Sequence, residues 1–141
     1  MTEITSALLY LGVTSPPTPI AERPRASIYA DTSMNWQLLS QAFSRLGMPI
    51  TTAYTTLGEE GLETSLVEPD VEVIFCGPDQ VGMVARVIAR AEKVKWVVYD
   101  GEARADQVRR DTQPGCNLTA GCSRRDRWRV DVAERTDRPP L

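Results

Sequence analysis

The sequence of 141 residues contains no histidine and only three cysteines, Cys76, Cys116 and Cys122. Without histidine this chain excludes a Ser-His-Asp or Cys-His nucleophile system, and mixed Cys/His zinc sites are excluded as well. Cys116 and Cys122 lie six positions apart with no second pair, so we expect two thiols in a loop rather than a metal site. The odd number of cysteines favours a reducing compartment over a disulfide scaffold.

Long apolar runs and phosphate-binding loops are missing too. The apolar run at residues 7–11 is far shorter than the ~20 residues that a membrane-spanning helix requires. Glu3 stands where a secretory signal would carry positive charge. Neither GxGxxG nor GxxxxGK[ST] occurs, and Gly58 and Gly61 flank two carboxylates, Glu59-Glu60, that would repel an anion. We therefore expect no transmembrane segment and no phosphate site of this kind.

Charge is unevenly distributed along the chain. The net charge is only −3, which argues against nucleic acid as a partner. Residues 1–103 carry 7 basic and 13 acidic side chains, whereas residues 104–141 carry 9 arginines, no lysine and 6 acids. The second stretch has few aliphatic residues, so we expect a disordered, Arg-rich tail. Its run at residues 123–129 combines arginine with tryptophan, but the neighbouring acids dilute its attraction for RNA.

The remaining pattern predicts an α/β fold. Four prolines within residues 14–25 indicate a linker, and we expect regular structure to begin after it. From residue 26, short apolar segments alternate with amphipathic ones, and strands joined by crossover helices must lie parallel. We predict a partial three-layer unit with about four parallel strands, at residues 26–30, 50–54, 71–76 and 94–99. The predicted division is thus an N-terminal segment and linker (1–25), an α/β unit (26–103) and the tail (104–141).

Several side chains are predicted to start or stop the helices. Asp31, Thr32 and Ser33 offer oxygens to cap the first helix after the linker, and Gly47 is expected to end it. Thr56 and Glu59 have the spacing of a capping box. In the same way, Asp79 is expected to cap a helix with an inward face at Val81, Val84, Val87, Ile88 and Ala91.

Three residues invite a functional interpretation beside a structural one. Asp31 follows the first strand, where open α/β sheets commonly bind ligands, but a helix cap is the favoured role. Trp36 could line a pocket, although its helical spacing with Leu39 and Phe43 favours the core. Glu72 marks a strand end or a solvated edge. Taken together, the residues form no catalytic constellation, and we assign no catalytic, cofactor-binding or metal-binding residue.

Residues 26–102 contain sequence motifs that point to a particular family, although their side chains suggest no particular reaction. Residues 28–32 (Ile-Tyr-Ala-Asp-Thr), 35–37 (Asn-Trp-Gln), 54–62 (Tyr-Thr-Thr-Leu-Gly-Glu-Glu-Gly-Leu) and 93–99 (Lys-Val-Lys-Trp-Val-Val-Tyr) are the segments concerned. In their residues, order and spacing, these segments resemble the amino-terminal region of long-chain acyl-CoA synthetases, which belong to the AMP-forming adenylating enzymes. The similarity is greatest to the eukaryotic members, fungal ones included.

This resemblance implies a parent enzyme that joins a fatty acid to coenzyme A through an acyl-adenylate, with ATP, Mg²⁺ and CoA as cofactors and substrates. The family's ATP-gripping loop ends in Pro-Lys-Gly, which this sequence lacks. No functional residue of the family can therefore be carried over, and we expect a fragment that is inactive alone and binds no cofactor itself. The resemblance also implies a cytoplasmic location, or a peripheral one at the endoplasmic reticulum, a lipid droplet or a peroxisome.

Two other functions stay open: a free-standing flavodoxin-like binding or regulatory module, and an interaction fragment that caps or competes with a full-length synthetase. An excised unit would expose core faces, so self-association and marginal solubility are expected. The abrupt change of composition near Arg104 is typical of a read-through intron, a frameshift or a truncated gene model.

Overall fold

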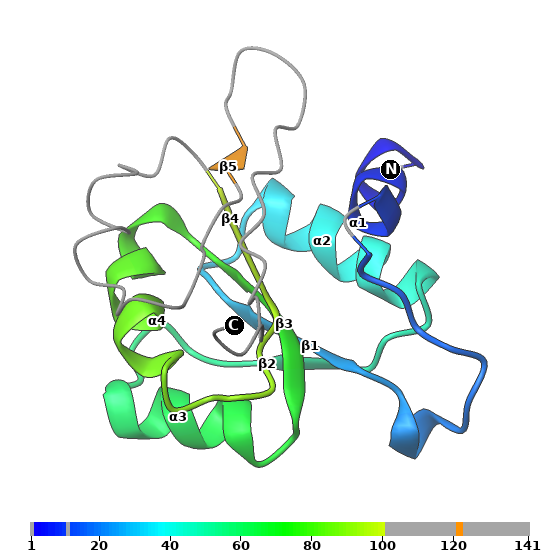
Figure 1. Cartoon of the computed structure of the whole chain (residues 1–141). Helices are drawn as coiled ribbons and strands as arrows, with labels where there is room; N and C mark the ends of the chain where they lie inside the picture. Colours follow the sequence, from blue (N-terminus) through cyan, green and yellow to red (C-terminus); the bar gives the residue numbers. More distant parts are fainter. Residues whose placement is uncertain (1, 11, 101–120, 123–141) are drawn as a thin grey trace, which may run out of the picture.

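The computed structural model describes residues 2–10, 12–100 and 121–122, and its centre is a parallel sheet (Figure 1). The strand order is β2-β1-β3-β4-β5, and every pairing is parallel. The predicted α/β unit with about four parallel strands is confirmed, and a two-residue fifth strand extends it. The strands are β1 (Arg25–Tyr29), β2 (Ile50–Thr52), β3 (Val71–Cys76), β4 (Trp96–Asp100) and β5 (Gly121–Cys122).

Helices cover both faces of this sheet, which gives three layers (Figure 1). The helices α1 and α2 lie on one face, and α3 and α4 on the other. No helix among the described residues is long and apolar enough to cross a membrane. In chain order the helical elements are α1 (Thr2–Tyr10), η1 (Ile20–Glu22), α2 (Met34–Arg45), α3 (Glu59–Val67), η2 (Pro78–Gln80) and α4 (Val81–Val87).

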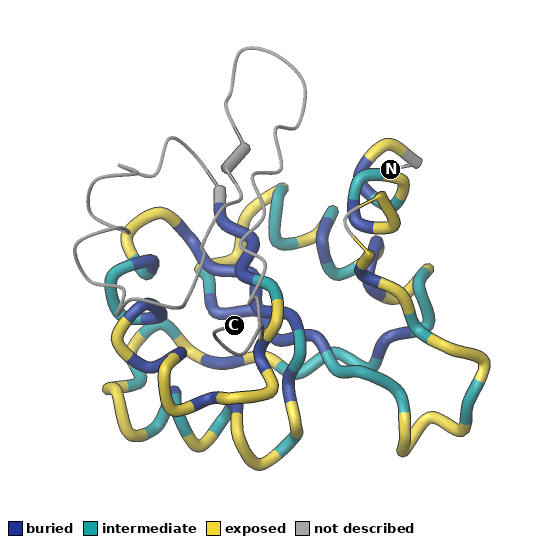
Figure 2. Tube along the Cα trace, in the orientation of Figure 1, coloured by how far each residue is buried: buried dark blue, intermediate teal, exposed yellow. Residues whose placement is uncertain are grey.

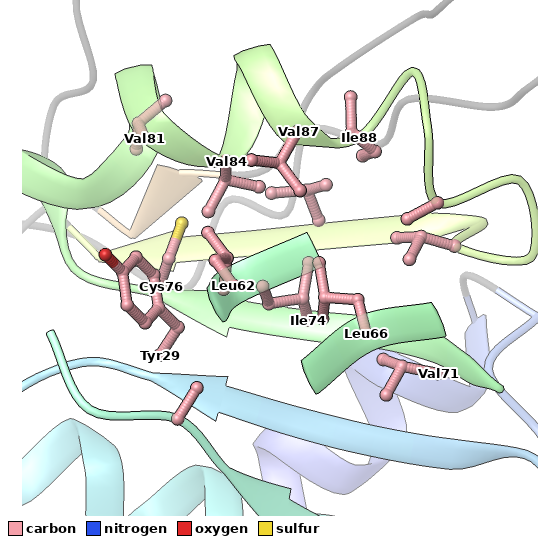
Figure 3. Close-up of a cluster of buried hydrophobic side chains, with 14 of the residues drawn as sticks. Tyr29, Leu62, Leu66, Val71, Ile74, Cys76, Val81, Val84, Val87 and Ile88 are labelled. Carbon is pink, nitrogen blue, oxygen red and sulfur yellow. The ribbon is translucent and has the colours of Figure 1, made fainter. Parts of the chain in front are cut away.

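Two separate apolar cores hold the layers together (Figure 2). The core beneath α3 and α4 includes Leu62, Leu66, Ile74 and Val84, all nearly inaccessible (Figure 3). All five residues of the inward face predicted for the last helix are buried, but α4 ends at Val87, so Ile88 and Ala91 lie beyond it. We call this side the α3/α4 face.

The opposite core lies between the sheet and α1 and α2, and we call this side the α1/α2 face. Phe43 and Leu39 of α2 are fully buried there, and Trp36 packs against them half-buried. The prediction that Trp36 belongs to the core is therefore confirmed. Side chains of α1 complete this core, with Ile4 and Leu8 contributing.

The expectation that regular structure begins only after residue 25 was wrong. Residues 2–10 form α1, whose buried face is formed by Ile4 and Leu8, one helical turn apart, while Leu9 and Tyr10 of the apolar run are exposed. The helix ends where Gly12 takes a φ of +84°, and the Val13 N–H donates to the Leu8 carbonyl at 3.0 Å. This left-handed ending satisfies carbonyls that the last turn leaves unpaired.

The predicted start and stop of α2 agree with the structure. The Ser33 hydroxyl accepts from the Trp36 N–H at 3.1 Å, so Ser33 is the capping member of the predicted cluster. Gly47, with a φ of +71°, ends the helix. The N–H groups of Gly47 and Met48 donate to the Ser44 and Phe43 carbonyls, each at 3.0 Å, which is the Schellman pattern.

The predicted caps of the two later helices were wrong. Gly58 is the N-cap of α3 and Glu59 is its first residue, so Thr56 and Glu59 form no capping box. A turn closed by the Leu57 N–H and the Tyr54 carbonyl occupies the place where the helix was expected to begin. Asp79 lies in the short η2 turn, and α4 starts at Val81 without a side-chain cap.

Glu72 coincides with an irregularity of β3. Arg25 is paired with Val71 and Ala26 with Val73, so one extra residue is accommodated between them. The bulge turns Val71 toward the α3/α4 face and Val73 toward the other. Glu72 itself is half-buried and pairs with Lys95 at 2.9 Å, which agrees with a strand end.

Candidate functional site

The carboxyl edge of the sheet is the candidate site, because the strand order places a topological switch point there. β1 is followed by α2 on one face, and its neighbour β3 is followed by α4 on the other. Open α/β sheets bind ligands in the crevice that such a divergence creates. Residues 30–33 and 77–80 form the two connections on either side of this point.

These two connections lie beside each other at Gly77, where glycine leaves room for the Gln80 side chain. A Cβ built on Gly77 would meet the Gln80 side-chain oxygen, and it would lie 4.0 Å from the Cβ of Ala30. Gly77 is buried, whereas Pro78 and Asp79 are exposed. The connection after β3 therefore lies directly against the connection after β1.

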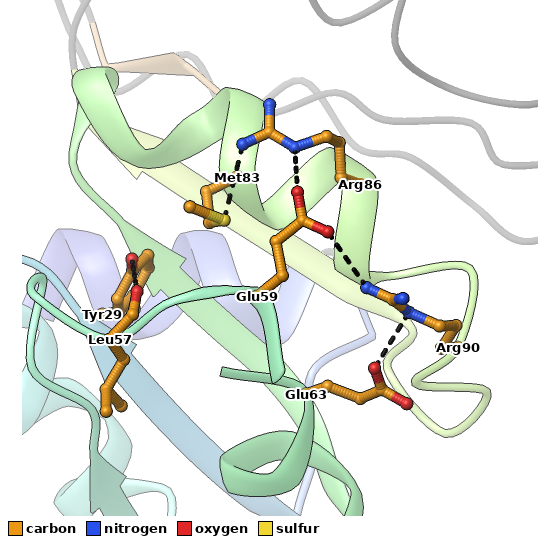
Figure 4. Close-up of polar contacts among 7 residues, drawn as sticks. All are labelled: Tyr29, Leu57, Glu59, Glu63, Met83, Arg86 and Arg90. Carbon is orange, nitrogen blue, oxygen red and sulfur yellow. Dashed lines mark hydrogen bonds and ion pairs between the residues drawn. The ribbon is translucent and has the colours of Figure 1, made fainter. Parts of the chain in front are cut away.

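Side chains at the end of β1 fasten the loop that follows β2. Asp31 Oδ1 accepts a hydrogen bond from the Thr55 hydroxyl at 2.8 Å. The Tyr29 hydroxyl contacts the carbonyls of Thr55 and Leu57, each at 3.3 Å, and its single hydrogen is shared between them. Figure 4 shows the contact with Leu57. We call these four residues the latch. Asp31 is thus a loop anchor, and the predicted helix cap is supplied by Ser33 instead.

Tyr29 was not recognised from the sequence, although a signal was present. Residues two apart on a strand point to the same side. Tyr29 and Asp31 could therefore both be expected to contact the loop that follows the neighbouring strand. Tyr29 is 1% exposed, and burial, followed by the nearby Cys76, raises the pKa of its phenol above the ordinary value. The phenol therefore stays protonated and able to donate.

Cys76 ends β3 beside Tyr29 in the α3/α4 core (Figure 3). Complete burial raises the pKa of this thiol to about 12. Because the thiolate is the nucleophilic form, Cys76 is an apolar core residue at neutral pH and not a nucleophile. The Ser27 hydroxyl, also buried, has no hydrogen-bond partner among the described residues.

The charged side chains of the two connections, residues 30–33 and 77–80, are carboxylates. Asp31 and Asp79 are exposed on either side of the switch point. Glu59 and Glu60 occupy the first turn of α3, where negative charge complements the helix dipole, as predicted. These carboxylates carry the opposite charge to the positioned cations that an adenylyl-transfer transition state requires.

The two lysines of the described residues lie away from the candidate site, whereas Arg86 contacts Glu59. Lys93 and Lys95 pair with Asp70 and Glu72, which precede or begin β3 at the opposite edge of the sheet. Arg86 of α4 and Arg90, which follows α4, are paired with two glutamates of α3, Glu59 and Glu63 (Figure 4). Within the described ranges, no group of three or more potential metal-ligating side chains occurs.

Other sequence predictions fall outside the described residues. They concern Cys116, the side chain of Cys122, the Arg-Trp run at 123–129, and the disorder expected for residues 104–141. Of that last stretch the structure describes only Gly121–Cys122, as β5.

Comparison with known proteins gives this arrangement a family context. Long-chain-fatty-acid–CoA ligase 2 of Schizosaccharomyces pombe is 33% identical over 103 residues, which are 73% of this chain and 14% of that protein. Long-chain-fatty-acid–CoA ligase 4 of Saccharomyces cerevisiae is 37% identical over 73 residues, 52% of this chain and 10% of that protein. The matching segment is homologous to long-chain-fatty-acid–CoA ligases. No family model matches the chain.

Solved structures of such enzymes share the fold. The anthranilate CoA ligase AuaEII, crystallised with anthranoyl-AMP, superposes with a TM-score of 0.60 at 14% identity, and the match covers 84% of this chain and 24% of that one. This chain thus spans only about a seventh of the S. pombe ligase and a quarter of AuaEII. Segments 28–32 and 54–62, which carry the sequence resemblance, are the two that the latch joins.

Proposed function

We propose that residues 25–100 are a piece of the scaffold of a long-chain-fatty-acid–CoA ligase, from its amino-terminal region. The latch is the observation that carries this proposal. Tyr29, Asp31, Thr55 and Leu57 lie within the segments that resemble the ligases, and they are engaged in holding two loops together. The residues that carry the resemblance therefore fix the positions of loops at one edge of the sheet, and the four latch residues perform no chemical step themselves.

We further propose that the 141-residue chain alone does not activate fatty acids. ATP, Mg²⁺ and CoA are requirements of the proposed parent enzyme, as are the cations that stabilise phosphoryl charge. The described carboxyl edge offers acidic groups to such substrates, and the sequence has no Pro-Lys-Gly loop. As a piece of such a ligase, the chain would reside in the cytoplasm or at the surface of the endoplasmic reticulum, a lipid droplet or a peroxisome.

A thioesterification assay tests the inactivity. Purified chain is incubated with ATP, Mg²⁺, CoA and palmitate, and palmitoyl-CoA is quantified by mass spectrometry beside the S. pombe ligase 2 as a positive control. Hydroxylamine in a parallel sample traps acyl-adenylate and so reports the first half-reaction separately. We expect both products at the level of heat-denatured chain. Turnover in either sample that rises with chain concentration would refute the proposal.

A flavodoxin-like binding module is the second candidate, and the strand order favours it. The order 2-1-3-4-5 is that of doubly wound domains that bind a nucleotide-like ligand at the β1/β3 switch point. Titration of ¹⁵N-labelled chain with AMP, CoA or FMN would distinguish the two. Saturable shifts confined to residues 30–33 and 77–80, and abolished by Asp31→Asn, would establish a binding module. The scaffold proposal predicts no saturable shifts there.

A further inference from the structure

The segment between α1 and β1 is attached to the domain along its length. We call residues 12–24 the strap. Its proline-rich sequence indicated a plain linker. However, Arg23 at its end and Arg25, the first residue of β1, each donate one hydrogen bond to the strap and one to a turn of the sheet. Arg23 donates from Nε to the Thr18 carbonyl at 2.8 Å and from Nη1 to the Gly47 carbonyl at 3.2 Å.

Arg25 repeats this arrangement on the other side of β1. It donates from Nη2 to the Ala21 carbonyl at 3.1 Å and from Nη1 to the Pro69 carbonyl at 2.8 Å. Gly47 lies in the turn before β2, and Pro69 lies in the turn before β3. Because β2 and β3 flank β1, the two guanidinium groups join the strap to both neighbours at the amino edge of the sheet.

The strap holds α1 over the far part of the α1/α2 face. Ile4, Leu8 and Val13 are at most 4% exposed there, in one core with Val98 of β4. A Cβ built on Gly12 would lie 3.7 Å from the Trp96 ring, so the end of α1 lies against β4. α1 therefore covers apolar surface of a strand that follows it by more than eighty residues.

We propose that α1 and the strap form one detachable unit, which opens from the sheet together and whose opening is controlled by Arg23 and Arg25. The unit has a single covalent connection to the rest of the described fold, at the start of β1. The polar contacts that attach it include the bonds from Arg23 to the Gly47 carbonyl and from Arg25 to the Ala21 carbonyl, and one from the Ser15 hydroxyl to the Gly47 carbonyl at 3.5 Å; all three are partly or fully solvent-accessible. Segments held in this way open locally at lower free energy than the whole domain. Opening uncovers Trp96 and Val98 of β4.

Hydrogen exchange of the full chain, followed by mass spectrometry, tests this unit. The double variant Arg23→Gln, Arg25→Gln removes both guanidinium groups and keeps hydrogen-bonding side chains. Loss of such charge-assisted bonds should accelerate exchange of α1 amides about tenfold and of β3 amides much less, since Arg25 also holds the Pro69 carbonyl before β3. Arg45→Gln is the matched control, because Arg45 is exposed at the end of α2. We expect it to change neither element.

Two results would overturn the proposal. Equal acceleration in α1 and β3 would show that the domain opens only as a whole, and unchanged exchange in α1 would show that the arginines do not hold it. If the double variant does not fold, Arg23→Lys gives the same test, since lysine keeps the charge but lacks the planar fork that reaches two carbonyls. Faster α1 exchange in this variant supports the proposal, and an unchanged rate contradicts it. Neither variant alters the latch, so the result is independent of the proposed ligase function.

Discussion

The two faces of the sheet are built in different ways. On the α3/α4 face α3 follows β2 and α4 follows β3, and ion pairs join α3 to Arg86 of α4 and to Arg90 just beyond α4. On the α1/α2 face, α2 follows its strand, but α1 comes from ahead of the first strand and is held by the strap. One face is thus completed by local connections, whereas the other depends on a distant segment that must return and dock.

This difference predicts unequal behaviour when each face is weakened. Both cores are closely packed, so a large buried residue should matter equally for global stability on either side. The outermost element of the α1/α2 face should behave otherwise, because it can leave while the sheet persists.

The largest effect is expected from Phe43→Ala on α2. Phe43 and its counterpart on the other face, Leu62 of α3, are both fully buried. Truncation should lower the free energy of unfolding by about 3–5 kcal/mol for Phe43→Ala and about 2–5 kcal/mol for Leu62→Ala. Urea denaturation followed by circular dichroism measures both. Met34→Ala, at a position 78% exposed on α2, is the control. A cost below about 1 kcal/mol for Phe43→Ala would mean that the α1/α2 face is not part of the cooperative core.

Leu8→Ala on α1 should cost less than Leu62→Ala, although Leu8 is 2% exposed. The loss of global stability is limited by the free energy of releasing α1, so we expect about 2 kcal/mol, the lower end for a buried leucine. Leu9→Ala is a matched control, since Leu9 is the next residue of the same helix and is 48% exposed. Amide exchange should show the full effect in α1 and a smaller one in β3. Identical effects in the two elements would remove the distinction between the faces.

Glycine substitutions should have opposite signs on the two faces. Gly47→Ala places a Cβ at a φ of +71° and 3.0 Å from Arg23 Nη1, so it should destabilise by about 1–2 kcal/mol and loosen the strap. Gly82→Ala, in the helix α4, meets its nearest neighbour at 4.0 Å and should stabilise by about 0.5 kcal/mol. Thermal unfolding of both variants measures the pair. A neutral Gly47→Ala would show that the turn before β2 can readjust without cost.

The sequence predicted the structure well where it depends on neighbouring residues, and poorly where it depends on contacts between distant segments. Segment 71–76 was placed correctly because a continuous apolar run of that length is typical of a strand covered on both sides. Gly47 was also correct, since a left-handed helix ending strongly favours glycine. These features depend on residues close together in the chain.

The incorrect predictions concern interactions between distant residues. α1 was missed because nine residues with a short apolar run gain stability only by docking on α2 and β4. Glu59 was assigned to a capping box, but its carboxylate is engaged by Arg86, 27 residues further along. The latch was missed for the same reason, because the partner of Asp31 is Thr55, 24 residues further along the chain and after the neighbouring strand.

The smallest expected effect concerns the ion pairs of the α3/α4 face, and it depends on pH. The Arg86 hydrogen bond, with the charges of Arg86 and Arg90, lowers the pKa of Glu59 in the folded chain below its ordinary value. The unfolded state therefore binds more protons in the window between the two values, so this contribution to stability is present above the unfolded-state pKa. It is lost as the pH falls through the folded-state pKa.

Glu59→Gln tests this contribution, because the variant removes the titrating group and should flatten the acid limb of the stability curve slightly. Glu60→Gln is the matched control, since Glu60 is the next residue of the same helix turn, is exposed, and makes none of the ion pairs observed within the described part of the chain. Thermal unfolding between neutral and acidic pH compares the three proteins. The effect should be small, because exposed pairs are screened by water and salt. If Glu59→Gln and Glu60→Gln gave the same curve, the ion pairs would contribute nothing measurable, and the α3/α4 face would depend on its apolar core alone.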